Sequence, residues 1–164
     1  MRAVVITVSD RVSRGEAEDR SGPAAAARLG DLGFQVEVRV VADGVESVAG
    51  ALRTAVGEGA AVVVTTGGTG FGPRDLTPEA TRVVIDREAP GLAEAMRAAT
   101  FGVNPHGMLS RGVCGVAGSS LVVNLPGSVA GVVESLDVIG PALGHAVALL
   151  GGGGTDHDPK SSGH

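Results

Sequence analysis

The residues best suited to chemistry lie in a glycine-rich segment, Thr65–Asp75, which reads TTGGTGFGPRD. Glycine lets backbone N–H groups approach an anion closely, and consecutive amides can form an anion-binding nest to which threonine hydroxyls add donors. The segment fails the dinucleotide fingerprint because Pro73 stands at its last position. It fails the P-loop pattern because Pro73 and Arg74 replace the required lysine and hydroxyl residues. It predicts a different phosphate-binding loop that ends in Asp75. The alternative is a tight glycine turn in which Asp75 bonds nearby amides.

Two further carboxylates follow the strands predicted before this loop. Asp10 comes directly after Ser9 at the end of the first strand, and Asp43 precedes Gly44 at the end of the second. In an open α/β sheet, ligands bind at the carboxyl ends of the strands, so these acids and Asp75 should share one edge. Carboxylates beside a phosphate loop suit Mg²⁺, which prefers oxygen ligands. The alternative is that each acid caps a turn beside its own strand.

Positive charge comes almost entirely from arginine. Lys160 is the only lysine of the chain, so lysine-based covalent chemistry is excluded from the body of the protein. Arg11, Arg14 and Arg20 follow the first strand, where they could hold phosphates or form a solvated basic loop.

The other reactive residue types are scattered along the chain. Cys114 is the only cysteine, and its strand-like surroundings predict an inert core thiol. His106 and His145 accompany no serine or cysteine motif, so we expect structural or surface roles for both. His157 and His164 belong to the polar end of the chain, where we expect solvated side chains rather than metal ligands.

Strand and helix patterns alternate regularly between these segments. Runs of β-branched residues predict strands at 2–8, 34–41, 60–66, 111–117 and 120–125. Apolar spacing and terminal signals predict helices at 23–32, 45–56, from 77 onward, 92–99, 129–136 and 143–150. We expect Thr77 and Ser128 to cap two of these helices, and Pro141 to begin the last one. The order predicts a three-layer α/β fold, with a mostly parallel sheet and helices on both faces.

Size and composition restrict the function further. The 164 residues predict one domain over 1–150, followed by a flexible, glycine-rich polar tail over 151–164. A net charge of -5 and an aromatic content of 2% argue against nucleic-acid binding. No apolar run is expected to approach the roughly 20 residues of a membrane span. The N-terminus is too short and too soon polar for a signal peptide. With a lone cysteine, we expect a cytoplasmic protein with no nucleic-acid or membrane partner.

Four parts of the sequence resemble the molybdopterin adenylyltransferase family (MogA/MoaB), whose domain also forms the G domain of gephyrin. They are Thr7–Asp10 with Asp19–Pro23, Thr66–Ala80, Met108–Arg111 and Asn124–Ser128. The resemblance extends over about residues 2–150, with the motifs in the expected order.

This resemblance implies a molybdopterin-binding fold that usually assembles as a homotrimer, with a hexamer in MoaB-like members. It implies Mg²⁺- and ATP-dependent adenylylation of molybdopterin with release of pyrophosphate, before an insertion enzyme adds molybdenum. It places the catalytic acids, which would also hold Mg²⁺, at Asp75 and Asp43. With the polar groups at the strand ends, the expected substrate-binding residues are Ser9, Asp10, Thr66, Gly67, Gly68, Thr69, Gly70, Arg74, Ser110, Pro126, Gly127 and Ser128.

The sequence departs from the family after the last of these motifs. Family members often carry proline and a basic residue there, whereas Val129 and Ala130 follow Ser128 in this chain. This change would weaken a phosphate contact. It keeps open the alternative of a MoaB-type molybdopterin-binding protein without adenylyltransferase turnover.

Overall fold

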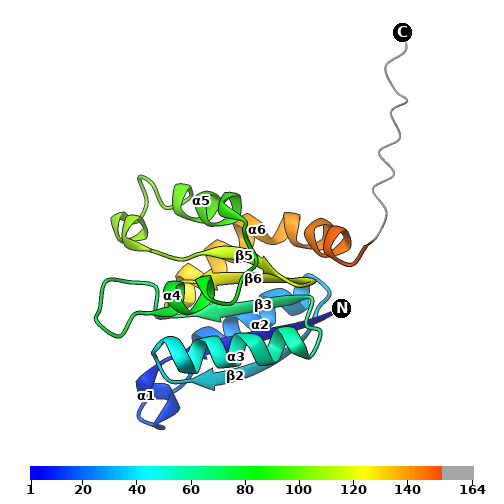
Figure 1. Ribbon diagram of the computed structural model, residues 1–164. Helices are drawn as coiled ribbons and strands as arrows, with labels where there is room; N and C mark the ends of the chain where they lie inside the picture. Colours follow the sequence, from blue (N-terminus) through cyan, green and yellow to red (C-terminus); the bar gives the residue numbers. More distant parts are fainter. Residues whose placement is uncertain (153–164) are drawn as a thin grey trace.

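A six-stranded sheet lies between two helical layers in the computed structural model, which describes residues 1–152 (Figure 1). The strands are β1 (Arg2–Val8), β2 (Gln35–Val41), β3 (Val62–Thr66), β4 (Arg87–Glu88), β5 (Cys114–Ala117) and β6 (Ser120–Leu125). Their order is β2-β1-β3-β6-β5-β4, and β1, β2, β3 and β6 pair in parallel. The strand β5 is antiparallel to both β6 and β4. The predicted three-layer, mostly parallel α/β fold is confirmed.

The middle of the sheet forms because its strands are apolar on both sides. Every residue of β3 and β6 is buried, and in β1 only Arg2 is partly exposed. Continuous apolar strands of this kind are typical of parallel sheets covered by helices on both faces. The short β4 was not predicted, since two residues carry no periodic pattern.

The helices divide between the two faces of the sheet. They are α1 (Asp10–Ser13), α2 (Ser21–Asp31), α3 (Val45–Gly57), α4 (Thr77–Arg82), α5 (Pro90–Ala98) and α6 (Val129–Leu150), with a 3-10 helix, η1 (Pro105–Leu109). Leu29 of α2 and Leu136 of α6 share one apolar core with Val5 of β1. Leu52 of α3 belongs to the core on the opposite face, together with Ile6. Alternate residues of β1 therefore serve two cores.

The last helix contradicts the prediction of two helices separated at Pro141. Residues 129–150 form one continuous helix, α6, with Pro141 inside it. Proline cannot bond to the carbonyl of residue 137, a local cost of about 3 kcal/mol. Ile139 and Leu143 flank the proline and are buried in the core that α6 shares with α2. Tertiary packing therefore outweighs the local helix-breaking signal.

The length of α6 also contradicts the prediction that no apolar run approaches the length of a membrane span. Within residues 1–152, α6 is the one helix long and apolar enough to cross a membrane by length and composition. In this fold it packs against the sheet as a core helix, with Val132, Leu136 and Leu143 buried.

Two predicted helix starts differ from the structure. The helix predicted over 23–32 is α2, which begins at Ser21 and not at Pro23. Thr77 does not cap α4; it is the first helical residue, and its hydroxyl donates to the carbonyl of Gly67 at 3.0 Å. Because Thr77 lies inside the first turn, its hydroxyl does not cap the helix and instead ties α4 to the glycine-rich segment.

The end of the chain is only partly covered by the structure. Gly151 and Gly152 follow α6, and residues 153–164 lie outside the described residues. The flexible tail over 151–164 therefore stays a prediction.

Candidate functional site

The predicted site residues come from loops that leave the same edge of the sheet. β1, β2, β3 and β6 are parallel, so the segments after Val8, Val41, Thr66 and Leu125 begin at one edge. The segment between β3 and α4, which we call the glycine loop (67–75), extends beyond the sheet in Figure 1. This is the place where open α/β sheets bind ligands.

The start of the glycine loop requires glycine for two reasons. Gly67 and Gly68 have φ angles of +92° and +68°, which side chains rarely adopt. A Cβ on Gly68 would lie 2.2 Å from Thr77 Oγ1, and one on Gly67 would lie 2.6 Å from the carbonyl oxygen of Val8. Larger residues would therefore push this turn away from β1 and α4.

The amides of the glycine loop are not all engaged in the fold. Gly67 N–H donates to the carbonyl of Leu125 at 3.2 Å and so continues the sheet. The N–H groups of Gly68, Thr69 and Gly70 donate to no acceptor among residues 1–152. Successive unpaired amides are the anion-binding arrangement expected from the sequence, starting one residue later.

Asp75 makes the turn contact considered for it, and one of its oxygens stays free. Its Oδ2 accepts a hydrogen bond from Gly72 N–H at 2.8 Å, which closes the end of the glycine loop. Its Oδ1 is used by no donor in the described chain, and the residue lines a large cleft. One oxygen therefore stabilises the turn while the other is available to a ligand.

The large cleft has a volume of about 840 Å³. Its walls are the glycine loop, the segment from α5 through η1, and the turn between β6 and α6. Among the predicted site residues it is lined by Gly67, Gly68, Thr69, Gly70, Asp75, Ser110, Pro126, Gly127 and Ser128. Small-molecule sites typically occupy roughly 300–1,000 Å³, so the cleft can enclose a nucleotide-sized ligand.

A second hollow of about 410 Å³ adjoins the large cleft. Gly67 and Gly127 line both, so they stand between the two cavities. The second hollow brings together Ser9, which caps α1, and Thr66, whose hydroxyl lies 2.7 Å from that of Ser21. The predicted residues are thus distributed over two neighbouring spaces.

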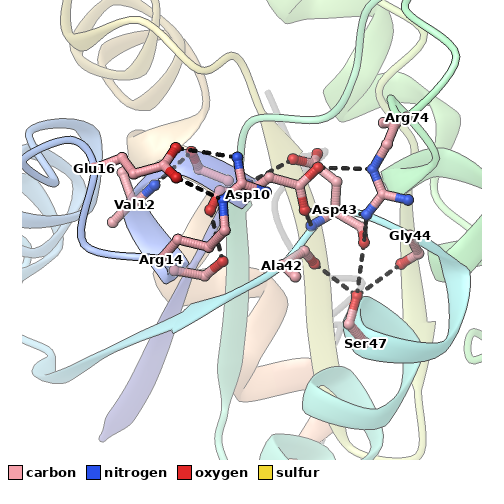
Figure 2. A network of polar contacts seen from close by, with 11 residues as sticks. Asp10, Val12, Arg14, Glu16, Ala42, Asp43, Gly44, Ser47 and Arg74 are labelled. Atoms are coloured by element: carbon pink, nitrogen blue, oxygen red, sulfur yellow. Dashed lines mark hydrogen bonds and ion pairs between the residues drawn. The ribbon is translucent and has the colours of Figure 1, made fainter.

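Asp10, Asp43 and Arg74 form a separate cluster, which we call the acid–arginine cluster (Figure 2). Asp10 N–H donates to Asp43 Oδ2 at 2.9 Å, and Asp43 N–H donates to Asp10 Oδ1 at 3.1 Å. Arg74 donates to both carboxylate oxygens of Asp10, at 2.7 and 3.0 Å, and to the backbone carbonyl of Asp43. The hydrogen bonds from Arg74 lower the pKa of Asp10 below its ordinary value.

The cluster changes how these three residues are interpreted. Asp10 and Asp43 cap each other's strand ends, which matches the local alternative considered for both. Arg74 is paired with Asp10 and does not line the large cleft. Asp43 keeps one oxygen, Oδ1, without a donor in the described chain, near the Gly68 backbone.

The oxygen atoms available at this edge of the sheet decide whether it could bind Mg²⁺. No group of three or more His, Cys, Asp or Glu residues within 1–152 could form a metal cage. Mg²⁺ is commonly held by one or two carboxylates together with substrate phosphates and water. Asp43 and Asp75 each retain a free oxygen, so their chemistry fits that mode of binding.

Sequence analysis missed the residue that holds the glycine loop in place. Arg111 Nε donates to the carbonyl of Gly70 at 2.9 Å, and its Nη2 donates to the carbonyl of Asp75 at 2.6 Å. Its guanidinium also pairs with Glu79 of α4, and its N–H donates to the carbonyl of Thr69 at 2.9 Å. The hydrogen bond from the Arg111 guanidinium lowers the pKa of Glu79. The family motif contained Arg111, but only the fold brings it to the loop.

Other predicted residues have clear local roles. Ser110 Oγ accepts from Gly112 N–H at 3.3 Å, and Ser128 caps α6 as predicted. Arg14 is paired with the neighbouring Glu16, so it is a solvated surface residue rather than part of the cleft. Cys114 is 1% exposed, and burial raises the pKa of its thiol to about 12, as expected for an inert core thiol.

The opposite wall of the large cleft was also not predicted. It contains Met96 and Arg97 of α5, Thr100, and Asn104 and His106 near η1. The segment from 99 to 109 is irregular, so no periodic pattern placed it opposite the glycine loop.

Comparison with known proteins agrees with this geometry. Residues 4–145 match the family described as "Probable molybdopterin binding domain". The chain belongs to this family of molybdopterin-binding domains, as the sequence motifs indicated.

Its relatives include proteins that are named as enzymes and proteins with longer chains. The chain is 38% identical over 152 residues to a protein named molybdopterin adenylyltransferase from Helicobacter pylori J99, covering 89% of this chain and 85% of the relative. It is 37% identical over 169 residues to gephyrin from Dictyostelium discoideum, covering 96% of this chain and 23% of that protein. The chain spans about a quarter to a half of the length of four curated relatives, gephyrin among them.

Solved structures of two named types share the fold. The Mog protein of Mycobacterium ulcerans has a TM-score of 0.86 and 45% identity, over 91% of this chain and 98% of that one. The MoaB enzyme of Thermus thermophilus also has a TM-score of 0.86 and 45% identity, over 92% and 96% of the two chains. Other relatives, from Synechococcus elongatus and Chlorobaculum tepidum, are named molybdenum cofactor biosynthesis bifunctional protein.

Proposed function

We propose that this protein transfers the adenylyl group of ATP to molybdopterin and releases pyrophosphate. The observation that carries this proposal is the glycine loop, in which the amides of Gly68, Thr69 and Gly70 and the Oδ1 of Asp75 are unpaired within the described chain, beside a cleft of about 840 Å³. Relatives named molybdopterin adenylyltransferase, 38% identical to this chain, supply the substrate class.

The reaction needs no covalent enzyme intermediate. An oxygen of the molybdopterin phosphate attacks the α-phosphorus of ATP, the bond to the β-phosphate breaks, and pyrophosphate leaves with the bonding electrons. The amides of Gly68, Thr69 and Gly70 would hold phosphate oxygens in position. Asp75 and Asp43 would hold Mg²⁺, which when bound neutralises charge on the transferred group.

The arrangement of two cavities suits a reaction between two anionic substrates. Gly67 and Gly127 stand between the large cleft and the second hollow, so ligands on either side would meet at the start of the glycine loop. Ser110 and the turn from Pro126 to Ser128 would border the ligand in the large cleft. The protein's contribution is then to bring two reacting phosphates together.

A second candidate function is molybdopterin binding without turnover. It is favoured by the MoaB structural relatives, among them the tungsten cofactor synthesising protein MoaB from Pyrococcus furiosus, at 38% identity and a TM-score of 0.82. A binder would need the cleft but not the free oxygens of Asp43 and Asp75.

Pyrophosphate release separates the two candidates. Purified protein is mixed with molybdopterin and MgATP, and pyrophosphate is measured with a coupled assay; omission of molybdopterin is the control. Pyrophosphate formed only with both substrates supports the transferase. Molybdopterin binding without pyrophosphate would establish the binder.

We also propose a homotrimer in the cytoplasm that delivers its product to a molybdenum-insertion enzyme. Exposed apolar residues, such as Val38 and Val40 on the edge strand β2, provide surface for subunit contacts. Light scattering should give about three times the chain mass of 16.2 kDa. Twice the mass of the trimer would indicate a MoaB-like hexamer, and a monomer mass would exclude the trimer.

A further inference from the structure

The charged side chains lining the large cleft are mainly acidic. Asp75, Glu134 and Asp137 line it, and Arg97 is the one arginine or lysine among the lining residues of the described chain. The proposed function requires a phosphate-bearing ligand, which is stable in a partly enclosed cleft only when its charge is paired. Arg97 is therefore the cleft's permanent positive charge.

Arg97 is held in a defined position. It lies on α5, and its Nη1 donates to the carbonyl of Gly112 at 2.9 Å and more weakly to that of Ser110 at 3.4 Å. These bonds fix the guanidinium against the turn that precedes β5. A guanidinium that is already fixed loses less conformational freedom when it binds a ligand.

The remaining donors of Arg97 are unused. Its Nε and Nη2 donate to no acceptor among the described residues. No buried side-chain nitrogen or oxygen in residues 1–152 lacks a hydrogen-bond partner, so these two nitrogens must be accessible to solvent. Arg97 lines the cleft, so a ligand bound there lies within the surroundings of these two nitrogens.

The position of Arg97 also connects it to the glycine loop. The carbonyl of Ser110 accepts from Arg97, and the next residue, Arg111, donates through its N–H to the carbonyl of Thr69. The 110–112 turn therefore joins two parts of the cleft: the wall formed by α5, and the glycine loop. Arg97 is thus connected to the glycine loop through this turn, and it lines the same cleft as the loop amides.

We propose that Arg97 binds a phosphate group of the ligand in the large cleft through its free Nε–H and Nη2–H groups. A guanidinium can form paired, charge-assisted hydrogen bonds to phosphate. The proposal rests on the proposed function in one respect, that the ligand carries phosphate. It does not require that the bound ligand react.

The test compares AMP with adenosine, which differ only in the phosphate. Calorimetric titration of each, in buffer without Mg²⁺, gives the ratio of their dissociation constants. Wild-type protein should prefer AMP by about 10- to 100-fold, the range expected for hydrogen bonds between charged groups. Arg97→Met should reduce this preference to within about threefold while leaving adenosine binding unchanged.

Arg82→Met is the matched control, because it removes the same charge from an exposed site on α4. Arg82 pairs with Glu88 at 3.6 Å and does not line the cleft. This variant should keep the wild-type preference for AMP. If Arg97→Met also keeps it, or if wild-type protein does not distinguish AMP from adenosine, the proposal is wrong.

A second variant covers the case in which Arg97→Met loosens the 110–112 turn and fails to fold. Arg97→Lys keeps the charge but loses the planar fork, so the preference for AMP should fall several-fold and become more sensitive to salt. An unchanged preference in this variant would overturn the paired geometry. Pyrophosphate release is measured separately, so AMP recognition without turnover would refute the proposed transferase and retain the role of Arg97.

Discussion

The acid–arginine cluster and the glycine loop lie at the same edge of the sheet and share Arg74, but they differ in how their polar groups are paired. In the cluster, Asp10, Asp43 and Arg74 bond mainly to one another. In the glycine loop, three successive amides and Asp75 Oδ1 have no partner in the described chain. Position at the sheet edge alone therefore does not distinguish a polar group that is bound within the fold from one that is free to bind a ligand; its hydrogen-bond partners do.

The paired region also supports the unpaired one. Arg74 directly precedes Asp75 and is fixed by Asp10, while Arg111 binds the Asp75 carbonyl. The end of the glycine loop is thus held at two points next to the carboxylate. Such support from surrounding residues is what keeps catalytic groups in a productive geometry.

The contrast between the paired cluster and the unpaired groups of the glycine loop is tested most strongly by Asp75→Asn. This substitution keeps the shape of the side chain but removes its charge. If Asp75 stabilises the transition state together with Mg²⁺, pyrophosphate release should fall by about 100-fold or more. Molybdopterin affinity should change much less. Near-normal turnover would show that the free oxygen of Asp75 has no chemical role.

Loosening the loop without changing Asp75 should have a smaller effect. Arg111→Lys keeps the charge but cannot reach Gly70, Asp75 and Glu79 together, so we expect about a 10-fold fall in kcat with little change in KM. Arg111→Gln should lower kcat further, so that the lysine variant retains part of the activity that glutamine loses. A change confined to KM would contradict a positioning role, and Arg82→Lys provides the surface control.

Removing the arginine of the cluster should affect catalysis less than either change. Arg74→Gln removes one of the two points that hold the end of the glycine loop, but Arg111 keeps the other, so kcat should stay within about threefold of wild type and thermal stability should fall only slightly. Steady-state kinetics and a melting curve measure both. A loss of turnover as large as that of Asp75→Asn would show that Arg74 leaves Asp10 to contact the substrate.

The smallest expected effect is on acid stability. The pKa of Asp10 is lower in the folded protein than its ordinary value of 3.8, so its ion pair stabilises the fold above about pH 4. This contribution is lost as the pH falls through the lowered pKa. Melting temperatures of wild type and Asp10→Asn should therefore differ at pH 6 and converge as the pH falls from about 4 through the lowered pKa of Asp10. A constant difference would mean that Asp10 acts through its geometry alone.

The sequence was sufficient where a local pattern and the fold agreed. The buried strands, the sheet edge and the glycine loop were predicted because β-branched runs and glycine spacing have direct structural consequences. Pro141 was misinterpreted because burial of Ile139 and Leu143 outweighs a local signal. Arg97 and Arg111 had no predicted role, since each acts through backbone carbonyls that only the folded chain brings near.

The burial of Cys114 has a practical consequence for measuring motion. Thiol reagents attack the thiolate, and a buried thiol with a pKa of about 12 offers almost none at neutral pH. A cysteine introduced at the exposed Phe71 would therefore take up a fluorescent label at a single position on the glycine loop without removal of the native cysteine. In the unaltered protein, the labelling rate of Cys114 would report how often the sheet opens.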